Sequence, residues 1–241
     1  MLIRERGQVT FANPFAIQTT LSSPNIIAID GPAASGKSVV GMLIASTMGY
    51  RFLDTGSMYR AIAWYASENH IDPHNTAPLE ILARTVSMEV TENDGSVFVD
   101  GIRVPLKERR GHIDSTVSLV AKIEGVRKAM VEQQRLIAGK GNIVLAGRDI
   151  GTVVVPHASI KLYLDAPSNV RASRRYKELK ALGQKVKLQS ILEQLEMRDK
   201  IDVERTHSPL RPAHDAHIIN TEGITIAQVL NKALDLIKLD H

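Results

Sequence analysis

Residues 31–38 read Gly31-Pro32-Ala33-Ala34-Ser35-Gly36-Lys37-Ser38, and this stretch decides the fold of the 241-residue chain. Two glycines with four residues between them, followed directly by Lys and Ser, form the pattern of a phosphate-binding loop. The apolar run at residues 26–29 leads into the loop, and residues 39–48 follow it with helical spacing as far as Gly49. In this context, between a strand and a helix, backbone N–H groups converge on phosphate oxygens. The sequence therefore predicts a nucleoside triphosphate site at the end of a buried strand.

Each part of the loop has an expected role. Gly31 and Gly36 permit the backbone turn that aims amides at phosphate oxygens. Lys37 is expected to reach the β- and γ-phosphates, and the Ser38 hydroxyl to bind Mg²⁺. The alternative is a glycine turn with a surface lysine, which the strand and the helix on either side disfavour. The expected nucleotide-binding set is Gly31, Pro32, Ala33, Ala34, Ser35, Gly36, Lys37, Ser38 and Val39.

Along the rest of the chain, short apolar runs alternate with helical patterns, which is typical of an α/β fold. We expect five parallel strands, at residues 26–30, 51–53, 143–146, 160–165 and 217–220. Between the second and third, three short alternating runs (88–90, 97–99 and 102–104) are separated by turn sequences at 93–95 and 100–101, which predicts an antiparallel meander. Such a meander forms a separate lobe rather than joining the parallel sheet.

The composition limits the class of protein. With 44% apolar and 23% charged residues the chain is globular, and the lack of cysteine removes disulfides and thiolate metal sites. No run of about 18 apolar residues predicts a membrane-spanning helix, so we expect a cytoplasmic protein without a membrane partner. Residues 1–24 show no clear periodicity and are expected to be a mobile N-terminal extension ahead of one domain at 25–241. Arg4 and Arg6 give this segment a slight similarity to an organellar transit peptide, but Glu5 and the lack of a basic amphipathic pattern argue against one.

The net charge of +4 comes from one segment. Residues 171–187 hold seven basic residues and one acidic residue, whereas acids are in slight excess over the remaining sequence. Tyr176 is the one aromatic residue among these bases, so a stacking platform for single-stranded nucleic acid is poorly supported. We therefore expect a small phosphorylated ligand and no nucleic-acid partner.

Two segments supply anion-binding groups away from the loop. Residues 52–60 place an Asp, a hydroxyl and a Gly at a strand end, with Arg60 one helical turn further on. Residues 147–152 follow a buried strand, where α/β sheets place ligand contacts, and there Arg148 offers a phosphate fork and Asp149 an acceptor. For the first segment, the alternative is a helix N-cap with a surface arginine.

A third group lies near residue 200. Arg198, Asp202 and Arg205 recur at spacings of four and three, which places all three on one helix face. Taken alone, they are better explained as a self-paired surface stripe worth tenths of a kcal/mol.

Together these segments resemble the bacterial-type cytidylate kinases, a family of phosphate-loop (P-loop) nucleoside monophosphate kinases. The resemblance runs from residue 26 to the last helix, about nine-tenths of the chain. It rests on the loop at 31–38, Leu-Asp-Thr-Gly-Ser-Met-Tyr-Arg at 53–60, Val-Arg at 126–127, Gly-Arg-Asp-Ile-Gly-Thr-Val-Val at 147–154, Arg-Asp-x-x-Asp-x-x-Arg at 198–205 and Ser-Pro-Leu at 208–210. The family transfers a phosphoryl group from ATP to CMP or dCMP, giving ADP and CDP or dCDP, in pyrimidine nucleotide salvage and recycling.

The resemblance implies a role for each matching residue. Ser118, Arg127 and Asp149 would read the cytosine. Thr55, Arg198 and Asp202 would hold the ribose side, and Arg60, Arg148 and Arg205 the acceptor phosphate. ATP would be the donor and Mg²⁺ its metal ion. The expected catalytic set is Lys37, Arg148, Arg174, Arg175 and Arg205.

The resemblance also locates two mobile or inserted parts. The basic segment falls where the family has a helical lid over ATP, about 171–190, and Arg174 and Arg175 are its expected phosphate contacts. The antiparallel insert, about 75–113, falls beside the CMP site. Ala146 departs from the family, in which many members carry an acid at this position, so help to Mg²⁺ from there is in doubt. Residues 1–24 have no assigned counterpart.

Two other function classes stay open at this point. One is a P-loop kinase for another small acceptor, and the other is a nucleic-acid-dependent or regulatory NTPase. We expect a monomer, and the preference between CMP and dCMP is not fixed by the sequence.

Overall fold

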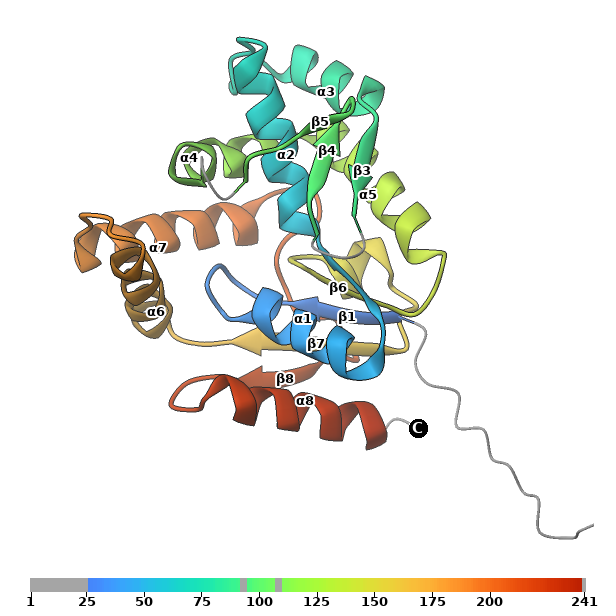
Figure 1. Ribbon diagram of the computed structural model, residues 1–241, viewed down its shortest axis with the longest axis vertical. Coiled ribbons are helices and arrows are strands. Elements are labelled where there is room, and N and C mark those ends of the chain that lie inside the picture. Colours follow the sequence, from blue (N-terminus) through green and yellow to red (C-terminus); the bar gives the residue numbers. More distant parts are fainter. Residues whose placement is uncertain (1–25, 92–94, 107–109, 240–241) are drawn as a thin grey trace, which may run out of the picture.

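The structure, a computed structural model, describes residues 26–91, 95–106 and 110–239 (Figure 1). The expected N-terminal extension at 1–24 lies outside the described residues, and so do positions 93 and 94 of the expected turn. No helix in the described part of the chain is long and apolar enough to cross a membrane.

A five-stranded parallel sheet forms the centre of the molecule, as predicted. Its strand order is β2-β6-β1-β7-β8, with β1 at Ile26–Asp30, β2 at Arg51–Asp54, β6 at Ile143–Gly147, β7 at Ile160–Asp165 and β8 at His217–Asn220. Strands β2 and β6 each extend one residue beyond the predicted end. The two extra residues, Asp54 and Gly147, belong to the edge of the sheet that carries the site.

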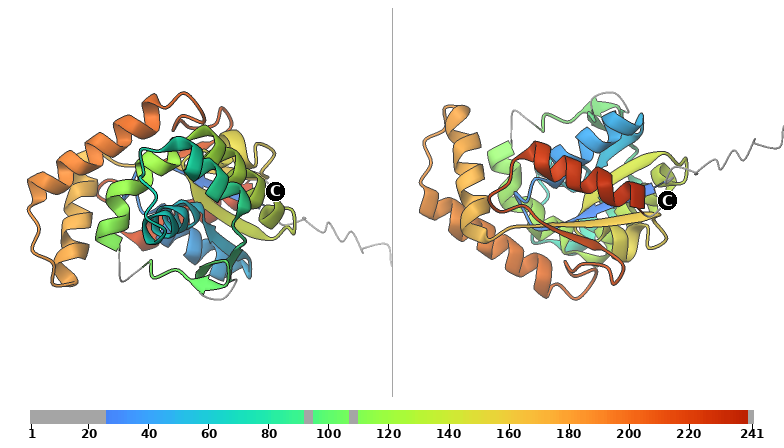
Figure 2. Two further views of the ribbon diagram at one scale, coloured as in Figure 1. Left: turned by 90° about the horizontal axis from the view of Figure 1, so that it is seen from above. Right: turned by 90° about the horizontal axis from the view of Figure 1, so that it is seen from below.

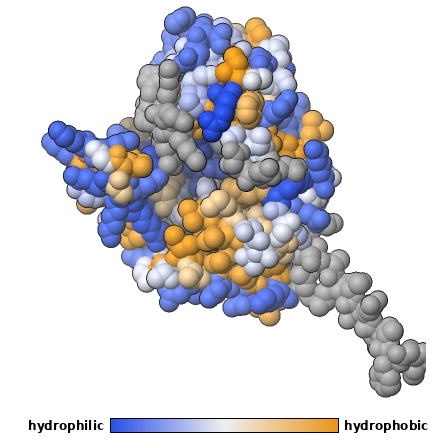
Figure 3. Space-filling model, in the orientation of Figure 1, coloured by the Kyte–Doolittle hydropathy of each residue, from blue (hydrophilic) through white to orange (hydrophobic). Residues whose placement is uncertain are grey.

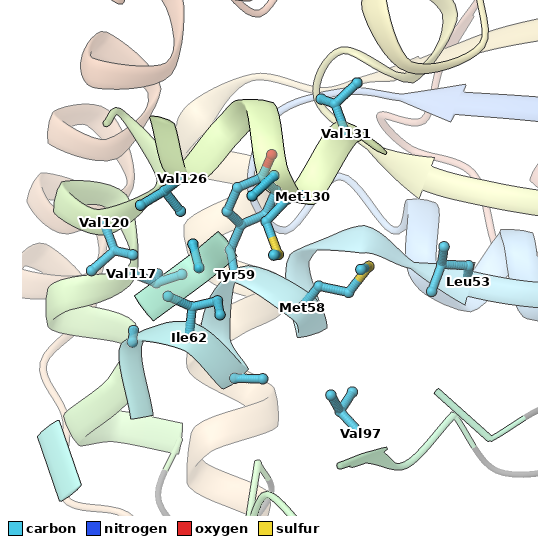
Figure 4. Packing of buried hydrophobic residues seen from close by; sticks show 14 of the residues in the cluster. Leu53, Met58, Tyr59, Ile62, Val97, Val117, Val120, Val126, Met130 and Val131 are labelled. Atoms are coloured by element: carbon cyan, nitrogen blue, oxygen red, sulfur yellow. The ribbon is translucent and has the colours of Figure 1, made fainter. Parts of the chain in front are cut away.

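Helices cover both faces of this sheet (Figures 1 and 2). Because side chains alternate along a strand, Ile27 and Ile29 pack with helices α1 (Lys37–Met48) and α8 (Ile226–Leu239), whereas Ala28 packs with the opposite cluster. That cluster joins α2 (Thr55–Glu68), α4 (Arg110–Ala121) and α5 (Glu124–Ala138) around residues such as Met58 and Met130 (Figure 4). Burial of all of β6, and of all of β1 except Ile26, explains why both strands read as apolar runs without alternation.

The antiparallel meander forms a second sheet, separate from the first, as predicted. Strands β3 (Met88–Val90), β4 (Val97–Val99) and β5 (Ile102–Arg103) pair in the order β3-β4-β5. Asp100 and Gly101 both adopt positive φ, at 50° and 77°, and make the second turn. The buried valines of β4 join the core cluster beside α2, and α3 (Thr76–Thr85) completes this lobe against α5.

Helices α6 (Ser168–Ala181) and α7 (Leu188–Glu204) pack on each other beyond the carboxyl ends of the strands (Figure 1). A small apolar cluster joins the pair to the phosphate loop through Ala33, Ala172 and Ile191. The space-filling view shows polar residues over this pair and an apolar surface over α1, where Val39 and Met42 are exposed (Figure 3). The basic segment thus begins on α6 beside the loop and continues through the connection to α7.

Candidate active site

The phosphate loop joins β1 to α1 through backbone angles and a close contact that its glycines permit. Gly31 has φ 149°, and a Cβ there would lie 2.2 Å from the backbone oxygen of Leu164. Gly36 has φ 94° at the N-terminal end of α1. Only glycine adopts these angles and this close approach without strain, so the loop depends on both positions.

Lys37 is buried at the first position of α1 and donates a hydrogen bond from Nζ to the Pro32 backbone oxygen at 2.9 Å. Burial and the nearby Arg148 guanidinium hold the pKa of Lys37 well below its ordinary value. A polyanion beside this ammonium group would favour its charged form. The loop therefore presents a buried lysine whose charged form a phosphate chain would stabilise.

One pocket at the carboxyl ends of the strands brings the predicted groups together. Loop residues Ala33, Ala34, Lys37 and Ser38 line it, as does Arg175 from α6. All nine residues expected to bind the acceptor line the same pocket: Thr55, Arg60, Ser118, Arg127, Arg148, Asp149, Arg198, Asp202 and Arg205. Residues from four helices and from the turn after β6, which span 150 positions of the chain, thus share one cleft with the loop.

A buried ionic cluster occupies the side of the pocket near α5. The carboxylate of Asp149 forms a close ion pair with Arg127, and Arg205 lies 3.6 Å from its other oxygen. The guanidinium of Arg127 also lies over the ring of Tyr59, 5.3 Å from the centroid. The side chains of Arg127, Asp149 and Arg205 are at most 6% exposed, and Tyr59 is 7% exposed. Asp149 is therefore fixed by cations on both of its oxygens.

A second cluster connects β6 to α7. Arg148 donates from Nε to Asp202 Oδ2 at 2.9 Å, and Arg205 lies 3.8 Å from the other oxygen of Asp202. Burial opposes ionisation of Asp202, but the neighbouring guanidinium groups, that of Arg148 first, outweigh burial and hold its pKa below the ordinary value. Because the side chains of Asp202 and Arg205 are only 8% and 5% exposed at the pocket, the interpretation of this segment as a surface stripe is wrong. The prediction that all three residues share one helix face is also wrong for Arg205, which lies just beyond α7 as its C-cap.

Thr55 and Arg60 occupy the start of α2. Thr55 donates its hydroxyl hydrogen bond to the Ala146 backbone oxygen at 3.0 Å, and a Cβ on Gly147 would lie 2.6 Å from that hydroxyl oxygen. The side chain of Ala146 itself packs in the apolar cluster beneath α1. The departure at Ala146 therefore falls on the core side of β6, away from the hydroxyl of Thr55.

Asp54 is a polar residue of the site that is missing from the predicted binding set. Its carboxylate accepts hydrogen bonds from Ser38 Oγ at 3.1 Å, from the Gly56 backbone N–H at 3.0 Å and from Arg60 at 3.2 Å. Burial opposes its ionisation, but Arg60 and Lys37 together hold its pKa below the ordinary value. Its position as the last residue of β2, next to Thr55, is the signal that could have identified it.

The arginines of the basic segment point in different directions. Arg175 lines the pocket and pairs with Glu178 at 2.8 Å. Arg174 instead donates to the Thr221 hydroxyl at 2.9 Å and lines a separate groove between α6, α7 and the turn that precedes α8. Arg171, absent from the predicted set, donates to the Ala33 backbone oxygen at 3.0 Å and so anchors α6 to the phosphate loop.

Known proteins are similar to this chain in sequence over most of its length. The family described as cytidylate kinase matches residues 27–239. A cytidylate kinase of Bacillus velezensis is 43% identical over 214 residues, which cover 88% of this chain and 96% of that protein. A cytidylate kinase of Clostridium tetani is 42% identical over 213 residues, covering 88% of this chain and 93% of that protein.

Solved structures give a fainter likeness. The shikimate kinase from Acinetobacter baumannii in complex with shikimate aligns with 91% of this chain and 95% of its own, at 18% identity and a TM-score of 0.44. The match in sequence to the cytidylate kinases is much stronger. It spans the segments at 53–60 and 147–154, the antiparallel insert and the helices α6 and α7. The chain belongs to the cytidylate kinase family.

Proposed function

We propose that the pocket transfers a phosphoryl group from ATP to CMP or dCMP and releases ADP and CDP or dCDP, in pyrimidine nucleotide salvage and recycling. Membership of the cytidylate kinase family makes the protein an ATP-dependent phosphotransferase. The observation that carries the acceptor assignment is the convergence of all nine expected acceptor-binding residues on the cleft that holds Lys37 and Ser38. The two ends of the pocket thus take donor and acceptor.

The reaction needs positioning more than proton transfer. The nucleophile is an oxygen of the CMP phosphate, which is already anionic at neutral pH, so no strong general base is required. The main obstacle is repulsion between two polyanions, and catalysis then depends on orientation and charge neutralisation. Lys37 on the donor side supplies a cation to the same pocket as Arg148 and Arg205 on the acceptor side.

The pocket also offers a magnesium site of the expected chemistry. In the described part of the chain no three acidic or histidine side chains gather to hold a metal on their own. Mg²⁺ in kinases commonly takes one or two protein oxygens and completes its shell with phosphate oxygens and water. The Ser38 hydroxyl and the ionised Asp54 carboxylate, 3.1 Å apart, fit that role. The ion would neutralise charge on the triphosphate.

Base selection follows from Asp149. Cytosine carries an exocyclic amino donor where uracil carries a carbonyl acceptor, and an ionised carboxylate accepts only. Arg127 and Arg205 hold Asp149 in the pocket through ion pairs to its two carboxylate oxygens. We therefore assign Asp149 to the cytosine amino group, with Arg127 and Ser118 on the rest of the base.

Water is the competing nucleophile, and α6 with α7 would exclude it. A helical lid that completes the site only when CMP is bound suppresses ATP hydrolysis. Arg175 is the phosphate contact that this lid offers to the pocket, whereas Arg174 reaches it only if its bonds to Thr221 break. The monomeric state and the cytoplasmic location stay predictions.

The experiment that tests the function compares acceptors. ADP formation from ATP is measured with added CMP, dCMP, UMP, AMP, RNA or DNA. Dependence on CMP or dCMP supports the proposal. ADP formation that depends on a different small acceptor, or on RNA or DNA, supports one of the two other function classes.

A further inference from the structure

Asp30 is a buried acid that the proposed mechanism does not use. It is the last residue of β1 and stands directly before Gly31 of the phosphate loop. Its side chain is in the protein interior, with the residue 3% exposed. One carboxylate oxygen accepts from the Ile150 N–H at 2.8 Å, and the other accepts from the Gly151 N–H at 2.8 Å.

These two bonds close a turn that carries two site residues. In the sheet, Asp30 is the register partner of Gly147, the last residue of β6. The chain then makes the turn at Arg148 and Asp149 and returns, so that the next two backbone N–H groups meet the Asp30 side chain. Asp30 thus holds both ends of the turn, through the strand pairing on one side and through its carboxylate on the other.

The geometry at the far end of the turn is that of a helix cap. Residues 150–154 form a short π-helical turn whose first N–H groups have no partner within the turn. A carboxylate from another strand supplies the acceptors that a local capping residue normally supplies, while the side chain of Asp149 makes no capping bond and turns to Arg127 and Arg205 instead.

An acid at this place is costly, which argues for a specific role. The pKa of Asp30 is raised to about 6, chiefly by burial and also by the charge of Asp149. The hydrogen bonds from Gly151 and Ile150 and the charge of Lys37 act in the opposite direction. An asparagine would keep one accepting oxygen but turn its amide N–H₂ toward the second backbone N–H. Only a carboxylate satisfies both donors at once.

We propose that Asp30 is a positioning residue that sets Arg148 and Asp149 in register with the phosphate loop. The inference rests on the proposed function, because it assigns Asp149 to the base and Arg148 to the acceptor phosphate. Asp30 then links the donor site to the acceptor site. Its backbone continues into the phosphate loop that binds ATP, and its side chain fixes the turn that binds CMP. Displacement of such a turn by about 1 Å can cost a hundredfold in rate.

The test is Asp30→Asn, with kcat/KM measured for CMP and for UMP and KM measured for ATP. We expect kcat/KM for CMP to fall between roughly ten- and a hundredfold, and that for UMP to fall less, so that the preference for CMP narrows. The KM for ATP should stay within about twofold, since the loop amides do not bond to the Asp30 side chain. In the double variant Asp30→Asn/Asp149→Ala, the preference for CMP over UMP should be close to that of Asp149→Ala alone, because Asp30 acts on base selection through Asp149.

Lys161→Met is the matched control. Lys161 is also buried next to Gly151, with its Nζ paired to Asp215 at 2.6 Å, and methionine keeps most of the stem while removing the charge. This variant removes the buried charge of Lys161 but keeps the hydrogen bonds from the N–H groups of Ile150 and Gly151 to Asp30. The preference for CMP over UMP should match that of the wild type.

Gly151→Ala is the second variant, used if Asp30→Asn fails to fold as judged by thermal unfolding. A Cβ at 151 would lie 3.1 Å from Lys161 Cδ, which is a crowded contact, and 3.5 Å from Asp30 Oδ2, which is an ordinary one. Relief of the crowding against Lys161 moves the backbone at 151, and with it the N–H that bonds to Asp30, without removing a polar group. It should narrow the preference in the same direction.

Equal fractional losses for CMP and UMP in the folded variant overturn the role of Asp30, as does an unchanged preference in Gly151→Ala when that variant must be used. These results are distinct from failure of the proposed function, in which the wild-type protein itself forms no CDP.

Discussion

Ser38 donates its hydroxyl hydrogen bond to Asp54 Oδ2 at 3.1 Å, which joins the phosphate loop to the end of β2. Both residues line the pocket. Asp54 is ionised at neutral pH, since Arg60 and Lys37 outweigh the effect of burial on its pKa. A hydroxyl and a carboxylate side by side at the donor end are a pair of oxygens suited to Mg²⁺.

Asp54→Asn should raise the Mg²⁺ concentration needed for half-maximal activity, because an amide oxygen binds the ion more weakly than a carboxylate. The measurement is a Mg²⁺ titration of kcat at saturating ATP and CMP. Asp165→Asn is the control, since Asp165 also ends a strand and accepts from the backbone N–H that follows it. Identical titration curves for the wild type and the Asp54 variant would remove Asp54 from the metal site.

Lys37→Met should lower kcat by roughly 10³-fold or more, because it removes the cation expected to stabilise the transferring phosphoryl group. Lys161→Met again serves as the control, since Lys37 and Lys161 are each 6% exposed. Circular dichroism of both variants establishes that the fold is kept. A Lys37 variant that retains more than about a tenth of wild-type kcat would contradict the assignment of the loop.

The two adjacent lid arginines should behave differently. Arg175→Ala should lower kcat more than Arg174→Ala, because Arg175 lines the pocket and Arg174 is bonded to Thr221. Steady-state kinetics of the two single variants and the double variant measure this order. If activity is unchanged in the double variant while tight, salt-sensitive DNA or RNA binding is lost, the basic segment serves nucleic acid instead.

Asp149→Asn should lose kcat/KM for CMP far more than for UMP. Loss of a buried carboxylate that accepts from the cytosine amino group removes a discrimination that can reach roughly 10⁴-fold. Arg127 shares the recognition, so some preference should persist. The ratio of kcat/KM values for the two nucleotides is the measurement. Equal fractional losses would mean that Asp149 supports the pocket without reading the base.

Asp30 should give stability a specific pH dependence. Its pKa is about 6 in the folded protein against an ordinary value of 3.8, so between these values the folded state binds more protons than the unfolded state. The contribution of Asp30 to the free energy of unfolding is then highest at low pH and falls as pH rises through this window, by up to about 3 kcal/mol.

Urea unfolding at pH 4.5 and pH 7 measures this effect. The free energy of unfolding of Asp30→Asn minus that of the wild type should be larger at pH 7 than at pH 4.5. The wild type loses stability over this range as Asp30 ionises, whereas asparagine does not titrate. Asp165→Asn again serves as the control. A difference between Asp30→Asn and the wild type that does not change with pH would contradict the raised pKa.

Local patterns were enough to predict the fold. The apolar runs at 26–30 and 143–146 are buried on both faces, which is why they lack alternation and could be recognised as interior strands. The alternating runs of the meander likewise predicted its pairing, and Asp100-Gly101 its second turn. The predicted ends of β2 and β6 fell one residue short, because the terminal Asp54 and Gly147 carry no apolar signal.

The site needed more than local pattern. Arg198, Asp202 and Arg205 looked like a surface stripe until the segments were taken together, since burial against a distant strand leaves no mark on a helix of charged residues. Arg174 and Arg175 differ by about 100° around α6, and the sequence does not show which of the two faces the pocket. Arg171 and Asp30 were not predicted, because their partners lie more than 100 positions away.

The central claim is that CMP receives the terminal phosphoryl group of ATP. Incubation of the protein with Mg²⁺, CMP and ATP labelled in the γ-phosphate, followed by separation of the nucleotides, measures this transfer directly. The account predicts that the label appears in CDP, in step with ADP formation, and that UMP accepts far less of it. Label found in inorganic phosphate, at a rate indifferent to CMP, would contradict it.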